Sequence, residues 1–109
     1  MKADSHLGIA AELLKTFALV DEPKLLLACV EEVRKALRAA GIRPELARTL
    51  DRILSKHRES PMEFSRSGKL IIADDRFLLE TLDGAKIAAF IEEARREIGT
   101  HGRELLTGR

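Results

Sequence analysis

The sequence contains no tryptophan, tyrosine, asparagine or glutamine, and its single cysteine is Cys29. One cysteine excludes an intramolecular disulfide and a cysteine-rich zinc site, so neither cross-link supports the fold. The three histidines, His6, His57 and His101, lack the i,i+3 or i,i+4 partner that a metal site on a helix uses. We therefore expect no metal and no cofactor, and we expect stability to come from apolar packing.

Long apolar runs are also missing. No run approaches the roughly 20 residues that cross a bilayer, and residues 1–6 lack the apolar core of a signal peptide. The sequence predicts a cytoplasmic protein without a membrane partner.

The sequence also lacks an excess of charge of either sign, because its 109 residues include 19 Lys and Arg and 18 Asp and Glu. This balance is typical of one globular domain rather than a disordered or polyelectrolyte chain. Arginine outnumbers lysine by 12 to 7, which together with the missing amides favours a thermophilic source. A GC-rich genome that favours arginine and alanine codons explains the same bias, and both hypotheses stay open.

Helical spacing of apolar residues dominates the chain. It predicts helices over residues 5–20, 23–40 and 44–59, and a further helical segment from Arg76 that Gly84 divides into a short and a long helix. Gly41 is a natural cap for the second helix, and Asp83 for the last one. In the first helix the expected core residues are Leu7, Ala10, Leu14, Phe17 and Ala18.

Residues 62–73 change from helical spacing to alternation around a Ser67-Gly68 turn, which predicts a β-hairpin. The expected fold is therefore mainly α (α+β): a compact bundle of four to five helices, with one hairpin between the third helix and the C-terminal helices. Residues 1–98 form the single domain of this prediction, and residues 99–109, with three glycines, form a flexible tail.

The polar residues form no catalytic constellation. Cys29 lies on an apolar helix stripe and is followed by Glu31 and Glu32, so it is expected to be a buried structural thiol. Ser67-Gly68-Lys69 lacks the upstream glycine of a phosphate-binding loop. We expect a non-enzymatic protein, and we predict no small-molecule ligand.

Basic residues recur along the third predicted helix and continue toward the hairpin. The candidate nucleic-acid contacts are Arg48, Arg52, Lys56, Arg58, Arg66 and Lys69. The order of three helices and a hairpin, with a long helix after them, resembles winged-helix DNA-binding domains, and the resemblance covers residues 5–73. That resemblance implies a third helix lying in the major groove.

Arg52 and His57 stand five positions apart. This spacing resembles the R-x4-H motif of the HEPN ribonuclease superfamily of helical dimers, which implies RNA cleavage by these two residues as the one enzymatic alternative. On a regular helix the two side chains point about 140° apart, so they converge poorly within one chain.

Paired large apolar residues occur on more than one face of several elements. The candidate interaction surface consists of Leu25, Leu27, Leu78 and Leu79. Apolar surface that one small domain does not cover is typical of an interaction site, and a symmetric homodimer is the commonest solution. The sequence therefore favours a helical interaction protein that acts as a homodimer, with a nucleic-acid-binding regulator as the alternative.

Overall fold

The computed structural model describes residues 2–20, 22, 24–59, 63–64, 70–73 and 79–106. Of these residues, those up to Ser55 and those from Leu82 to Thr100 have described side chains. In these residues, four helices and three short strands follow one another as α1 (Ala3–Val20), α2 (Lys24–Ala39), α3 (Glu45–Glu59), β1 (Glu63–Phe64), β2 (Leu70–Ala73), β3 (Leu79–Leu82) and α4 (Gly84–Leu106). The protein is thus mainly helical.

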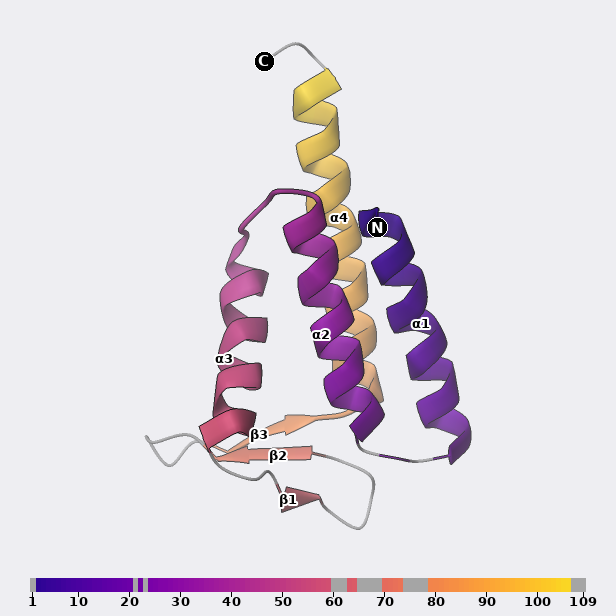
Figure 1. The fold of residues 1–109 in the computed structure, drawn as a ribbon, viewed down its shortest axis with the longest axis vertical. Coiled ribbons are helices and arrows are strands. Elements are labelled where there is room, and N and C mark those ends of the chain that lie inside the picture. The colour runs from indigo at the N-terminus through magenta and orange to yellow at the C-terminus, as the bar shows by residue number, and fades with distance from the viewer. Residues whose placement is uncertain are drawn as a thin grey trace.

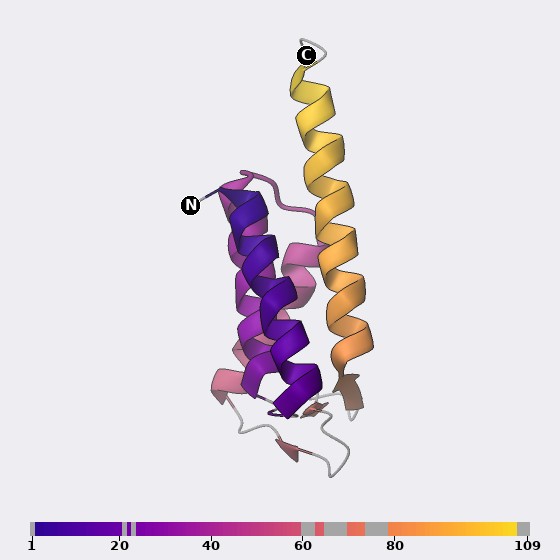
Figure 2. The same ribbon diagram turned by 90° about the vertical axis from the view of Figure 1, so that its right-hand side faces the viewer.

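The helices lie side by side with their axes roughly along one direction, and the strands lie across one end of them (Figure 1). α1 and α2 run in opposite directions, and α4 packs behind both. The last turns of α4 project beyond the other helices (Figure 2). One end of the bundle is therefore covered by the strands, whereas the other carries the corner between α2 and α3.

The core is formed by apolar side chains from every helix and from β3. The largest of its side chains with less than 2% exposure are Leu26, Val30, Val33, Leu37, Leu50, Leu82, Ile87 and Cys29. α3 also contributes Leu46 and Ile53 to the core, and α4 contributes Phe90 and Ala94. In α1 the predicted stripe is buried or half-buried except for Ala18, which is exposed.

The corner between α2 and α3 is fixed by hydrogen bonds of the backbone. Gly41 adopts a φ of 71°. Its N–H donates to the Arg38 carbonyl at 3.0 Å, and the Ile42 N–H donates to the Leu37 carbonyl at 3.2 Å. These two bonds form a Schellman motif, which satisfies the last carbonyls of a helix and needs a residue that tolerates positive φ. The predicted glycine cap therefore ends α2 and sets the direction of the chain into α3.

The strands form one antiparallel sheet in the order β1-β2-β3. Residues 62–73, where the sequence predicts one hairpin, contribute β1 and β2, and the segment between these strands lies outside the described residues. The helix predicted from Arg76 to Gly84 is wrong in its second half. Leu79–Leu82 instead pairs with Leu70–Ala73 over four residues, because the hydrogen bonds of a neighbouring strand override a weak local helical preference.

α4 starts at the predicted cap. The Asp83 carboxylate accepts a hydrogen bond from the Lys86 N–H at 2.9 Å, and the Asp83 carbonyl accepts one from the Ile87 N–H. The helix then continues to Leu106, whereas the sequence predicts that it ends at Ile98 and is followed by a flexible tail.

Candidate functional site

The core of the described part is wholly apolar. No polar or charged residue there is buried, and no buried side-chain nitrogen or oxygen atom lacks a hydrogen-bond partner. No helix in this part is long and apolar enough to cross a membrane. In this part, the polar groups able to bind a partner or ligand lie at the surface.

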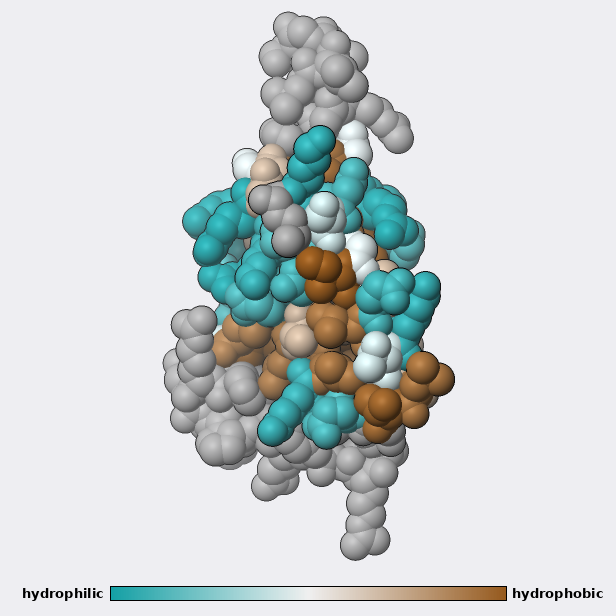
Figure 3. Space-filling view, turned by 45° about the vertical axis from the view of Figure 1, so that its right-hand side comes forward, coloured by the Kyte–Doolittle hydropathy of each residue, from teal (hydrophilic) through white to brown (hydrophobic). Residues whose placement is uncertain are grey.

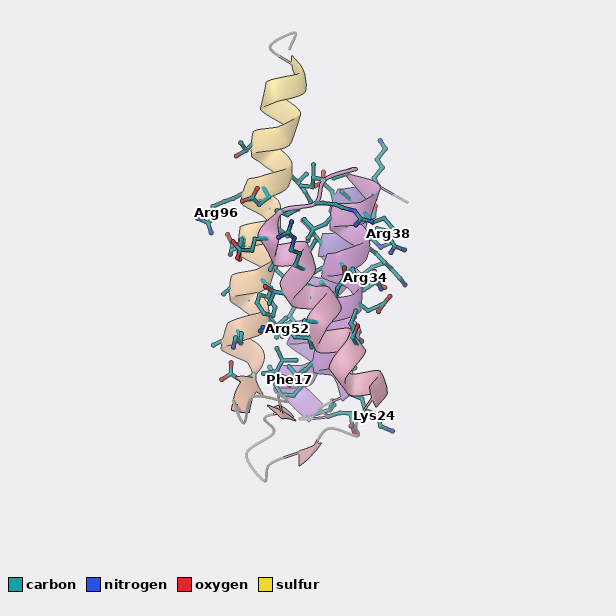
Figure 4. All side chains as sticks on the ribbon, turned by 90° about the vertical axis from the view of Figure 1, so that its left-hand side faces the viewer. Phe17, Lys24, Arg34, Arg38, Arg52 and Arg96 are labelled. Carbon is teal, nitrogen blue, oxygen red and sulfur yellow. The ribbon has the colours of Figure 1, made fainter. Side chains whose placement is uncertain are left out.

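The predicted basic row is divided by the structure. Arg48 and Arg52 are exposed on α3, whereas the side chains of Lys56, Arg58, Arg66 and Lys69 lie outside the described part. Arg52 lies on the side of α3 that faces α4, and Arg34 and Arg38 of α2 lie on the opposite side (Figure 4). The basic surface of α3 is therefore not limited to the predicted row of its own residues, because arginines of α2 stand beside it.

Four arginines surround a surface hollow of about 380 Å³ at the corner between α2 and α3. Arg34 and Arg38 come from α2, Arg43 from the connection and Arg48 from α3. Only Arg48 belongs to the predicted set. The others are missed because the sequence separates them, and the signal that would have found them is the short connection after Gly41, which brings the end of α2 beside the start of α3.

One of these arginines is already paired. The Arg34 guanidinium donates to the Asp51 carboxylate with its Nε at 2.7 Å and to Glu31 with its Nη1 at 3.4 Å. Within the described part of the chain, no ion pair engages Arg38, Arg43 or Arg48. Arg34 therefore joins α2 to α3, and the other three leave positive charge at the rim of the hollow.

Cys29 is buried against α1, and its thiol donates to the Ala10 carbonyl at 3.5 Å. Burial raises the pKa of this thiol to about 11, so the reactive thiolate is scarce at neutral pH. The residue fills the close contact between α1 and α2. Of the predicted Arg52 and His57 pair, only Arg52 has a described side chain.

The predicted interaction leucines are not the most exposed apolar residues. Leu25 and Leu27 are half-buried, and Leu27 packs against the core. Leu78 lies outside the described residues, and Leu79 belongs to β3 with its side chain undescribed. In the described part, the large apolar side chains that stand exposed are Ile9, Leu19 and Val20, all on α1.

α1 carries two apolar stripes. The inner stripe, Ala3, Leu7, Ala10, Leu14 and Phe17, faces the core. The outer stripe, which we define as Ile9, Leu13, Thr16 and Val20, follows spacings of four, three and four residues. This is the spacing of a coiled-coil seam. Ile9, Thr16 and Val20 are exposed, whereas Leu13 is half-buried and also packs against the core. Figure 3 shows hydrophobic surface running down this side of the molecule between hydrophilic flanks.

His6 and Glu32 tie α1 to α2 beside these stripes. The His6 Nδ1–H donates to the Glu32 carboxylate at 2.8 Å, with both side chains less than a fifth exposed. Burial alone would raise the pKa of Glu32, but hydrogen bonds from His6 and Lys35 lower it below its ordinary value. The contact therefore stabilises the ionised carboxylate and fixes the orientation of α1.

No family model, no curated protein and no solved structure matches this chain.

Proposed function

We propose that this protein is a non-enzymatic helical interaction protein that acts as a homodimer, assembled through the outer stripe of α1. The observation that carries the proposal is the outer stripe itself, because its spacing is that of a helix seam and Val20 stands 59% exposed. The inner stripe of the same helix is covered by α2 and α4. A second apolar stripe on an outer helix needs a partner of its own.

The spacing of the outer stripe favours a second copy as that partner. Reversing the direction of the helix leaves the order of four, three and four unchanged. In an antiparallel pair related by a two-fold axis, Ile9 would therefore lie opposite the partner's Val20, and Leu13 opposite the partner's Thr16. An isologous contact of this kind closes after two copies and leaves no free seam.

The polar groups around the stripe are compatible with such a seam. The Thr16 hydroxyl already donates to the Glu12 carbonyl at 3.0 Å, so the seam leaves this donor satisfied. Glu12 and Lys15 pair at 3.4 Å and are each 74% exposed on one flank. Opposite charges at the rim of the seam would not repel a second copy.

Light scattering coupled to size exclusion tests the proposal. A seam built on one helix is small, so we expect a dimer with a dissociation constant of roughly micromolar order and a dimer mass at about 100 µM. Ile9→Glu and Val20→Glu should each give a monomer with unchanged circular dichroism, since both side chains are exposed. Ala18→Glu adds the same charge at an exposed position of α1 away from the outer stripe and should remain a dimer. A wild-type monomer at about 100 µM would refute the proposal.

Disulfide trapping tests the arrangement of the two copies. Cys29 is buried, and burial raises its pKa to about 11, so it does not form disulfides under mild oxidation. The introduced cysteines are then the reactive thiols. Ile9→Cys combined with Val20→Cys should form a covalent dimer under mild oxidation. Each single variant should not, because an antiparallel seam separates identical positions. Trapping by the single variants instead would mean a parallel seam.

A further inference from the structure

The structure assigns a second binding site, distinct from the α1 seam: the arginine-lined hollow binds a small molecule that carries two or more phosphate charges. Two elements and their connection converge there, because the hollow is lined by the last turns of α2, the Gly41 corner and the first turns of α3. The sequence alone predicts no such ligand, since the four arginines meet only in the fold.

The charge of the hollow is strongly positive. Its lining contains four arginines and one acidic residue, Asp51, so four minus one leaves three positive charges. The Arg34 contact at 2.7 Å neutralises Asp51, and the three remaining charges belong to Arg38, Arg43 and Arg48. The whole chain carries a net charge of only +1, so this concentration is local.

Guanidinium groups are suited to phosphate because their donors form a planar fork that matches two phosphate oxygens. Three guanidinium groups carry three positive charges. A ligand with several negative charges therefore matches the hollow better than a ligand with a single carboxylate does. Apolar residues also line the hollow, with Leu37 buried and Ile42 and Ala47 half-buried.

The shape favours a small ligand over a nucleic acid. A volume of about 380 Å³ lies at the lower end for small-molecule pockets. A nucleic acid needs phosphate contacts along a track, but Arg52 lies on the other side of α3 from Arg34 and Arg38 (Figure 4). The arginines are thus gathered around a point rather than spread along a line.

The hollow is held open by the fold itself. The Schellman motif fixes the Gly41 corner, and the contact of Arg34 with Asp51 spans α2 and α3. A ligand would therefore meet arginines whose backbones are already in place, which lowers the entropy lost on binding. No rearrangement of the helices is needed.

Isothermal titration of the full chain with sodium tripolyphosphate, at about 50 mM salt, tests this assignment. We expect saturable binding of one equivalent per chain, and weaker binding of orthophosphate. Arg38→Gln, Arg43→Gln and Arg48→Gln should each weaken binding by about tenfold. Arg96→Gln removes the same charge from an exposed position on α4, outside the residues that line the hollow, and should leave the affinity unchanged.

Two outcomes would overturn the assignment. The first is no saturable binding, or an equal loss in Arg96→Gln, which would mean that the hollow is not a site. The second is a single-stranded RNA oligonucleotide that binds through Arg38, Arg43 and Arg48 more tightly than tripolyphosphate, which would assign these arginines to a nucleic acid. The oligomeric state of each variant is measured alongside, so failure here is separate from failure of the α1 seam.

Discussion

At the scale of single residues, the fold favours the ionised form of the Glu32 carboxyl. Its pKa is lowered in the folded chain from the ordinary value of 4.5, because hydrogen bonds from His6 and Lys35 outweigh the effect of burial. A carboxyl with a lowered pKa stabilises the folded state above its unfolded pKa, and this contribution is lost as pH falls through the folded pKa. The contact between α1 and α2 is therefore sensitive to acid.

We predict that Glu32→Gln lowers the free energy of unfolding by about 1 kcal/mol near neutral pH, since a charge-assisted hydrogen bond is weakened. Between about pH 5 and pH 3 the variant should lose less stability than the wild type, because it has no carboxylate to protonate. Urea unfolding followed by circular dichroism measures both effects. Glu12→Gln is the control, because Glu12 is 74% exposed and should show neither effect. Equal acid sensitivity of Glu32→Gln and the wild type would contradict this account.

At the scale of the elements, the Gly41 corner sets how α2 meets α3. With φ at 71°, a Cβ at this position meets no atom within 4 Å, so the cost of a side chain there is conformational rather than steric against neighbours. We predict that Gly41→Ala lowers the free energy of unfolding by about 1–2 kcal/mol, and that Gly41→Asn lowers it less. Gly8→Ala places the same methyl group inside α1, where nothing lies within 4 Å, and should raise stability by up to about 1 kcal/mol. Thermal unfolding distinguishes the two signs.

The sequence predicts well the helices whose ends are marked by a capping residue, a glycine or a proline. Gly41 marks the end of α2 to within a residue, Pro44 precedes α3, and Asp83 caps α4. β3 is missed because its stability depends on pairing with β2, which lies about ten residues away in the chain. A strand of four residues that depends on such a partner carries only a weak signal in its own sequence.

The two surface features escape prediction for related reasons. The hollow combines Arg34 and Arg38 with Arg43 and Arg48, and only the fold of the corner brings these pairs together. The outer stripe of α1 is present in the spacing of Ile9, Leu13, Thr16 and Val20. The inner stripe alone is enough to predict the helix, however, so the outer stripe is not needed for that prediction. A second stripe on the same helix adds nothing to the signal that predicts a helix.

At the scale of the whole molecule, the proposed seam and the hollow occupy different surfaces, since the first lies along α1 and the second at the corner of α2 and α3. Dimerisation would cover α1 and leave the four arginines accessible, so each copy of the dimer would bind its own ligand. The titration should then give the same stoichiometry per chain in the wild type and in the monomeric Val20→Glu variant. A half-equivalent per chain in the wild type would place the ligand between the two copies instead.

Dimerisation also couples stability to concentration, because a contact made only by the folded state stabilises it by mass action. We predict that raising the chain concentration from about 1 µM to about 100 µM increases the Tm of the wild type by about 5 °C. Val20→Glu should show one Tm at every concentration, because it lacks the seam, and Ala18→Glu should follow the wild type. Differential scanning calorimetry measures this directly. A Tm of the wild type that is constant over that range would mean that α1 meets water rather than a second copy.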